Sequence, residues 1–110
     1  MKLSIIIPNY NGLTFLKRFL SSVFKQEFGE KELIIVDNGS NDGSVDWLKG
    51  LNQEMVLIEL EENHGFSKAV NEGIKRSQGE YILLLNNDVL LTQDFLYKLY
   101  TFIIQKPKVF

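Results

Sequence analysis

Hydrophobic residues gather in four short runs along the chain, and each run stops at a cluster of polar residues. We predict strands over residues 3–7, 32–36, 55–60 and 81–85. The last run, Tyr81–Leu85, has no polar interruption, which is typical of a strand that helices cover on both faces. The apolar runs therefore indicate a buried sheet.

Between these runs, apolar residues recur at the spacing of an amphipathic helix. We predict four helices, around residues 15–24 (ending by Gly29), 45–51, 66–77 (ending by Gly79) and 95–103. Asp42 or Ser44 is expected to cap the second helix, and Thr92 the last. Strand and helix alternate four times, which is typical of a mainly parallel sheet with helices on both faces. The predicted fold class is Rossmann-like α/β, as in the mononucleotide-binding half of a doubly wound fold.

The four polar clusters should meet in space, because parallel strands end at a common edge and open α/β sheets bind ligands there. The cluster after the last strand, Asn86–Asp88, places one carboxylate beside two amides. Such oxygens suit a hard divalent cation, or they accept hydrogen bonds from sugar and ribose hydroxyls. A plain turn is the competing interpretation of this triplet.

The composition is that of a soluble globular domain, and it narrows the function classes. The 110 residues allow one domain, and a hydrophobic share of 45% argues against disorder. The net charge of −2 gives no basic field for nucleic acid. Without cysteine and with a single histidine, His64, the chain has no thiolate zinc site, cysteine nucleophile or multi-histidine metal site. No apolar stretch approaches a membrane span or a signal peptide, so we expect a cytoplasmic location.

Common nucleotide-binding and hydrolase motifs are missing, namely the P-loop, the glycine-rich dinucleotide fingerprint and the serine elbow. Four other segments, in order, resemble the family 2 glycosyltransferases with the GT-A fold: residues 5–12, 34–44, 63–73 and 81–89. The match runs from about Leu3 to Leu96, and the order and spacing of the four segments are more specific than any one of them. The resemblance implies that residues 1–110 form a single α/β domain that binds a nucleotide sugar.

The resemblance implies a nucleotide-binding role for twelve residues at the strand ends. Tyr10 offers a ring face on which a base can stack, and a surface turn tyrosine is the alternative. Asp37 is similar to the aspartate that recognises the base or ribose edge, and a turn-forming or helix-capping aspartate is the alternative. Gly65 lets the backbone approach a ligand. The full set is Pro8, Asn9, Tyr10, Asn11, Asp37, Asn38, Asn63, Gly65, Phe66, Asn71, Asn86 and Asn87.

The triplet Asn86–Asp88 stands at the family's Asp-x-Asp position, with Asn86 in place of the first aspartate. The resemblance implies that Asp88 binds a divalent cation, Mn²⁺ or Mg²⁺, that bridges the two phosphates of the donor. Loss of one carboxylate should weaken the metal affinity, because hard cations prefer charged oxygen. Asn-x-Asp triplets resemble the rhamnosyltransferase-like branch, which implies a UDP or dTDP sugar as donor.

The resemblance further implies an inverting transfer of a hexosyl or deoxyhexosyl group to a saccharide or lipid-linked acceptor, in cell wall or polysaccharide biosynthesis. Family members carry the base that deprotonates the acceptor in their second half, so the base is expected beyond Phe110. Residues 107–110 resemble the opening of a fifth strand, and we expect a domain cut short at its C-terminal end. The 110 residues alone are expected to bind nucleotide without transferring sugar. Peripheral attachment at the inner face of a membrane is the alternative to a purely cytoplasmic location.

Two other classes of protein share this kind of sheet. One is a catalytically silent nucleotide-binding or regulatory module, such as a receiver domain with Asp37 as phosphate acceptor. A receiver domain requires an acidic pair at the position of Pro8–Asn11, which the chain lacks. A nucleotidyltransferase would want a glycine-rich, basic first loop, which the chain lacks. The donor-binding part of a glycosyltransferase is therefore the preferred hypothesis.

Overall fold

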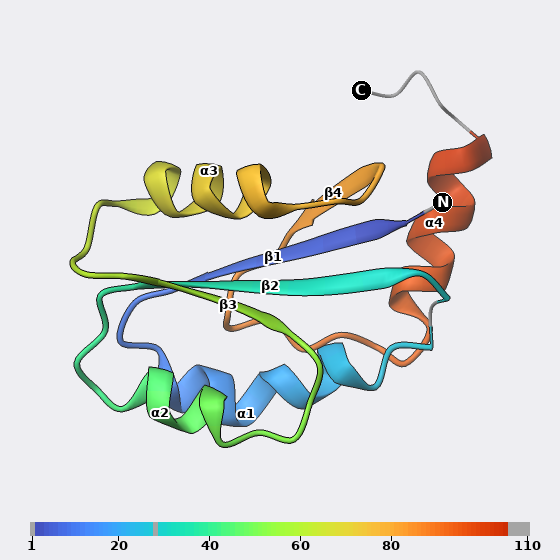
Figure 1. Cartoon of the computed structure of the whole chain (residues 1–110). Helices are drawn as coiled ribbons and strands as arrows, with labels where there is room; N and C mark the ends of the chain where they lie inside the picture. The colour runs from blue at the N-terminus through green and yellow to red at the C-terminus, as the bar shows by residue number, and fades with distance from the viewer. Residues whose placement is uncertain (1, 28, 106–110) are drawn as a thin grey trace.

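Four parallel strands form one sheet in the computed structural model of the chain, which describes residues 2–27 and 29–105 (Figure 1). The strands stand in the order β3-β2-β1-β4. Helix α3 lies on one face of the sheet, and α1 and α2 lie on the other (Figure 1). The predicted α/β fold class is confirmed. The elements are β1 (Leu3–Asn9), α1 (Leu13–Phe24), β2 (Lys31–Asn38), α2 (Ser44–Lys49), β3 (Val56–Leu60), α3 (Phe66–Arg76), β4 (Tyr81–Leu84) and α4 (Phe95–Gln105).

The two central strands are apolar on both faces, because alternate residues of a strand point to opposite sides and helices cover both. Ile5 and Ile35 belong to the larger cluster, together with residues of α1, α2 and α4. Ile6 and Ile34 are register partners and belong to a smaller cluster beneath α3. All four are fully buried. The core thus has two layers, and the sheet separates them.

Helix α3 packs closely on the sheet because it presents small residues to it. Ala69 and Gly73 are its buried residues. A Cβ placed on Gly73 would lie 2.6 Å from Cγ2 of Ile6 and 3.2 Å from Cγ2 of Val36. A larger side chain at either position would therefore push the helix away from β1 and β2.

Strands β1 and β2 extend further than the apolar runs predict. Their ladder continues through the pairs Pro8–Val36 and Asn9–Asp37, so polar residues expected in loops belong to strands. Pro8 does not end β1, because the pairing with β4 stops at Ile6 and no β4 neighbour needs the missing N–H of the proline. The polar ends of the two central strands are consequently held by the sheet itself.

The prediction that helices cover both faces of the last strand is wrong. Ile82 and Leu84 remain 45% and 41% exposed. Their register partners on β1 are Ser4 and Ile6, so they face the α3 side of the sheet. Helix α3 lies over β1, β2 and β3 and leaves this part of β4 uncovered. On the opposite face, Leu83 packs against the larger cluster as expected.

The end of α1 and the start of α4 are joined by a buried amide that the sequence did not reveal. Helix α1 ends at Phe24, well before Gly29. Gln26 then donates its Nε2 hydrogen to the carbonyl of Thr92 (2.6 Å) and accepts the N–H of Leu96 at its Oε1 (3.0 Å). Thr92 therefore contributes its carbonyl to this junction, and its hydroxyl donates to Oδ1 of Asp94 (3.4 Å). The predicted strand at 107–110 lies outside the described residues, and none of the helices within them is long and apolar enough to cross a membrane.

Candidate functional site

The carboxyl edge of the sheet holds a hollow of about 350 Å³. Its wall comes from the ends of all four strands and from the first turn of α3. Ten residues line it, and all ten belong to the set predicted from the sequence: Pro8, Asn9, Tyr10, Asn38, Asn63, Gly65, Phe66, Asn86, Asn87 and Asp88. The fold therefore brings most of the predicted site together, whereas Asn11, Asp37 and Asn71 are outside this lining.

Two aromatic rings stand at the hollow with much of their surface exposed. Tyr10 follows β1 and is 49% exposed, and Phe66 opens α3 and is 55% exposed. Large exposed rings beside polar groups are suited to stacking on a planar ligand. The remaining lining side chains are mostly amides, which both donate and accept hydrogen bonds.

The segment before α3 is shaped by two asparagines. Buried Asn38 accepts the N–H of His64 at its Oδ1 (2.9 Å) and donates from its Nδ2 to the carbonyl of Gly65 (3.0 Å). Asn63 accepts the N–H of Gly65 at its Oδ1 (2.8 Å). Gly65 has φ 89° and ψ 167°, a backbone region that only glycine adopts readily. Residues 63–65, between β3 and α3, are thus held in one conformation along the rim of the hollow.

A chain of hydrogen bonds lies beneath the hollow and joins β1, β2 and the turn after β4. Asn9 accepts a hydrogen bond at its Oδ1 from Nδ2 of Asn87 (2.8 Å) and donates from its Nδ2 to Oδ1 of Asp37 (3.0 Å). Asp37 also accepts the hydroxyl hydrogen of Ser40 (2.7 Å) and, at its Oδ2, the backbone N–H of Ser40 (2.9 Å). Asn9 and Asp37 are 2% and 1% exposed. Both oxygens of Asp37 are therefore engaged below the hollow.

Two residues were not predicted as site residues: Ser40, which belongs to this network, and Gly12, which lies beside it. Ser40 lies in the loop of residues 38–44, which the resemblance implies is beneath the nucleotide, but it was not singled out. Gly12 makes room for the network, since a Cβ there would lie 2.2 Å from Nδ2 of Asn87 and 2.4 Å from Oδ1 of Asn9. Only the contact between distant segments shows why this position is glycine.

Asn11 and Asp42 organise the loops next to the hollow. Asn11 has a left-handed backbone with φ 49°, which asparagine tolerates better than most residues. Asp42 accepts the first N–H of α1, from Leu13 (3.0 Å), and the first N–H of α2, from Ser44 (3.0 Å). Burial acts to raise the pKa of Asp42, but the hydrogen bonds from Ser44 and Leu13 outweigh it and lower the pKa. Asp42 thus caps two helices, although the N-cap position of α2 is Gly43, whose φ of 90° suits glycine.

The polar residues further along α3 face solvent. Asn71 is exposed. Lys68 places its Nζ 3.1 Å from Oε1 of Glu72, and this hydrogen bond is the main cause of the lowered pKa of Glu72. The ammonium of Lys68 is therefore engaged on the helix surface.

Asp88 is the single carboxylate among the residues that line the hollow. Within residues 2–27 and 29–105, no group of three or more histidine, cysteine, aspartate or glutamate side chains could hold a metal ion. One carboxylate beside the amides of Asn86 and Asn87 fits a cation that enters with a phosphorylated ligand, since Mg²⁺ is commonly held by one or two carboxylates and substrate phosphates. The donor set does not suit a cation bound by protein alone.

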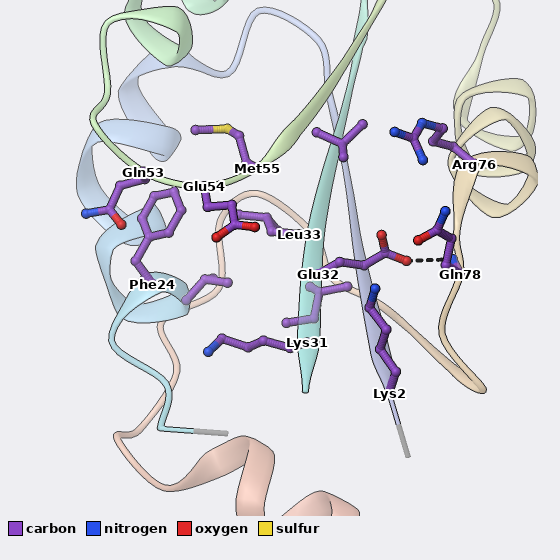
Figure 2. A pocket seen from close by; sticks show the side chains of 13 residues that line it. Lys2, Phe24, Lys31, Glu32, Leu33, Gln53, Glu54, Met55, Arg76 and Gln78 are labelled. Atoms are coloured by element: carbon purple, nitrogen blue, oxygen red, sulfur yellow. Dashed lines mark hydrogen bonds between the residues drawn. The ribbon is translucent and has the colours of Figure 1, made fainter. Parts of the chain in front are cut away.

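A larger hollow, of about 490 Å³, opens at the opposite edge of the sheet (Figure 2). Its charged groups have mixed signs, and Glu32 accepts the backbone N–H of Gln78 (2.6 Å) (Figure 2) and the hydroxyl hydrogen of Ser4. Burial acts to raise the pKa of Glu32, but these hydrogen bonds and the charges of Lys2 and Arg76 outweigh it and lower the pKa. This carboxylate holds the start of β4 in place. The smaller hollow is therefore the better candidate, because ligands of open α/β sheets bind at the carboxyl ends of the strands.

Residues 4–110 match the model of a protein family described as glycosyl transferase family 2. The chain is 34% identical over 94 residues to the poly-beta-1,6-N-acetyl-D-glucosamine synthase of Staphylococcus epidermidis. It is 29% identical over 94 residues to the synthase of the same name from Staphylococcus aureus. Each match covers 84% of this chain and 23% of the relative, so the chain spans about a quarter of the length of these proteins.

Solved structures with the same fold include two proteins with bound nucleotide sugars. TarS 1-349 from S. aureus, in complex with UDP-GlcNAc, has a TM-score of 0.85 at 30% identity, and the match covers 96% of this chain and 32% of TarS. The mannosyltransferase PcManGT from Pyrobaculum calidifontis, in complex with GDP-Man and Mn²⁺, has a TM-score of 0.86 at 22% identity, over 93% of this chain and 32% of that one. The second likeness shows the fold alone, and together they confirm the predicted GT-A fold.

Proposed function

The chain is a member of glycosyl transferase family 2, and on this premise we propose that the hollow at its carboxyl edge binds the nucleoside diphosphate of a sugar donor. The observation that supports this most is the convergence of ten residues from the four strand ends and the start of α3 on one hollow. TarS, at 30% identity, has been solved with UDP-GlcNAc, which favours a uridine diphosphate donor.

We assign different lining residues of the hollow to different parts of the donor. The exposed rings of Tyr10 and Phe66 supply stacking surfaces for the base. The amides of Asn38 and Asn63 are largely engaged with the backbone of His64 and Gly65, so we assign them the role of holding residues 63–65 beside the donor. We assign Asp88 and the neighbouring amides, which line the same hollow, to the diphosphate.

A divalent cation, Mn²⁺ or Mg²⁺, is proposed to enter with the diphosphate and to be held on the protein side by Asp88. When bound, such a cation neutralises the charge that develops on the departing nucleoside diphosphate. With one carboxylate at the site, we expect a modest metal affinity in the absence of nucleotide.

The whole reaction is proposed to be an inverting transfer of a hexosyl or deoxyhexosyl group to a saccharide acceptor. The similarity to synthases of poly-beta-1,6-N-acetyl-D-glucosamine, of which this chain matches 23%, supports this choice of acceptor class. Because Asp88 is the one carboxylate of the lining and is assigned to the cation, no lining residue is left to deprotonate an acceptor. We therefore propose that the 110 residues bind the donor without transferring its sugar.

Calorimetric titration of the 110-residue chain with UDP, dTDP and GDP, with and without Mn²⁺, tests the assignment. We expect UDP to bind and Mn²⁺ to strengthen its binding. Preferential binding of dTDP would instead support the rhamnosyltransferase-like branch that Asn86 suggests, and binding that Mn²⁺ does not affect would favour a silent nucleotide-binding module. A folded chain that binds none of the three would refute the proposal.

Two substitutions separate the roles of the ring and the carboxylate. Asp88→Ala should remove the effect of Mn²⁺ on UDP affinity, with Asp46→Ala, an exposed aspartate of α2, as the matched control. Tyr10→Ala should weaken UDP binding about tenfold with or without Mn²⁺, since a base–aromatic stack contributes about 1–3 kcal/mol. Tyr97→Ala, an exposed tyrosine of α4, is its control. Equal losses from Asp88→Ala and Tyr10→Ala in the absence of metal would contradict this division.

A further inference from the structure

We infer that Asp37 acts on the nucleotide site through Asn9, and that Asn9 is the residue that orients the turn containing Asn87 and Asp88. This inference rests on the proposed function of the hollow. The resemblance suggests that Asp37 meets the nucleotide directly, whereas its burial and its hydrogen bonds point to a role one step removed.

The orientation of each amide is set in one direction, from Asp37 to Asn9 and on to Asn87, because a carboxylate can only accept hydrogen bonds. Asp37 therefore requires Asn9 to turn its Nδ2 toward β2. The Oδ1 of Asn9 is then the atom that faces the turn after β4, and it requires the Nδ2 of Asn87 as donor. As a result, Asn87 keeps its own Oδ1 for the hollow that it lines.

The position of this network makes alternative arrangements costly. Asn9 and Asp37 are almost completely buried. A buried carboxylate or amide that loses a hydrogen-bond partner strongly destabilises the folded protein. Ser40 supplies two further hydrogen bonds to Asp37 and so fixes the carboxylate itself. The donor and acceptor pattern presented to the turn is thus determined inside the protein, before any ligand arrives.

Gly12 supports the same inference from a separate observation. The Asn9–Asn87 contact fills the space that a Cβ at position 12 would need, at 2.2 Å from Nδ2 of Asn87 and 2.4 Å from Oδ1 of Asn9. Gly12 has φ −105°, which other residues also adopt, so its conformation does not call for glycine. Glycine is needed at position 12 because the amides of Asn9 and Asn87 occupy the space of a side chain.

Exchanging the two side chains tests whether the carboxylate acts directly or through Asn9. Asn9→Asp alone brings two carboxylates together and removes the donor to Asp37, so UDP affinity should fall about tenfold or more. Asp37→Asn alone removes the accept-only group and leaves both amides free to reverse, and we expect a comparable loss.

The double variant Asn9→Asp with Asp37→Asn can form every contact again. The new carboxylate at position 9 accepts from Nδ2 of Asn87 and from the new amide at position 37, while the Ser40 hydroxyl accepts where it previously donated. UDP affinity should return to within about threefold of the unmodified chain, a difference below 1 kcal/mol. If the double variant binds as weakly as Asp37→Asn, Asp37 contacts the ligand directly and the inference is wrong.

A ligand-free readout separates this inference from the proposed function. In NMR spectra without nucleotide, the side-chain NH₂ signals of Asn87 should move in Asp37→Asn and return in the double variant, although positions 37 and 87 share no direct hydrogen bond. If the unmodified chain binds no UDP while these signals move as expected, the proposed function fails, but the orientation of the turn at Asn87 by Asp37 and Asn9 is supported. Unmoved signals overturn the inference.

Two further variants distinguish an effect on the orientation of Asn87 from a general loss of stability of the protein. Asn52→Asp adds the same charge at an exposed position and should leave UDP affinity and the Asn87 signals unchanged. If Asn9→Asp does not fold, Gly12→Ala replaces it, because the added methyl separates Asn9 from Asn87 while both amides remain. Full UDP affinity in Gly12→Ala, with thermal unfolding showing a folded chain, would also refute the inference.

Discussion

Replacing Gly73 by alanine should destabilise the protein, although alanine is the better helix former. The substitution adds a methyl group on the buried side of α3, 2.6 Å from Cγ2 of Ile6 and 3.2 Å from Cγ2 of Val36. Both neighbours are fully buried β-branched residues of central strands, so their methyl groups have little freedom to move aside.

Two opposing terms set the magnitude. Alanine in place of glycine within a helix gains about 0.8–1 kcal/mol. Excess volume in a well-packed core costs about 1–3 kcal/mol. The expected net loss for Gly73→Ala is therefore about 1 kcal/mol, which corresponds to a decrease of about 4 °C in the melting temperature of a domain of this size.

Urea unfolding followed by circular dichroism measures this difference, and Gly50→Ala is the matched control. Gly50 ends α2 with φ −80° and ψ −10°, and a Cβ there would meet only the carbonyl oxygens of Asp46 and Trp47, both at the ordinary distance of 3.5 Å. We expect Gly50→Ala to be neutral or stabilising by up to about 1 kcal/mol. A Gly73→Ala variant as stable as the unmodified chain would refute the packing argument, because it would show that α3 and β1 can separate at no cost.

Three further predictions concern stability. Asp42→Asn should lower the free energy of unfolding by about 1 kcal/mol at pH 7, because it weakens the cap at the N–H of Leu13, and by less at pH 3. The folded-state pKa of Asp42 is lowered, so the stability that its carboxylate contributes is present at neutral pH and is lost as the pH falls below about 4. Urea unfolding at both pH values checks this, and equal losses would contradict it. Ser4→Ala should cost about 1–3 kcal/mol, because the N–H of Gly79 loses the hydroxyl that accepts it; thermal unfolding measures the loss. Ile82→Thr, at the exposed face of β4, should change the free energy of unfolding by less than about 0.5 kcal/mol, and a larger loss would show that this face is covered in solution.

The pattern of apolar and polar residues was sufficient to predict the α/β fold class and the meeting of the polar clusters at one edge, whereas the individual lining residues were predicted from the family resemblance. Runs such as Leu33–Val36 can only be strands of a buried sheet when helical segments separate them, and parallel strands place their polar ends at one edge. Asn86, Asn87 and Asp88 therefore come close to Tyr10 without any knowledge of side-chain contacts.

Side-chain contacts between distant segments could not be predicted in this way. The hydrogen bond between Asn9 and Asn87 depends on the register of β1 with β4 and on the space above Gly12, neither of which is visible in local spacing. The exposure of Ile82 was missed for a related reason. An apolar run indicates burial on both faces, but whether a helix reaches an outer strand depends on where α3 crosses the sheet.

The strand order β3-β2-β1-β4 also has a consequence for how the chain folds. Strand β1 is made first, but one of its two neighbours, β4, is the last of the four strands that residues 2–27 and 29–105 contain. Asn9 meets Asp37 across 28 residues of chain and Asn87 across 78. The longer closure costs only about 0.9 kcal/mol more in chain entropy, so equilibrium hardly penalises it. During synthesis, however, the edge of β1 that pairs with β4 stays open until β4 has left the ribosome, and the hollow gains Asn86, Asn87 and Asp88 only at that stage.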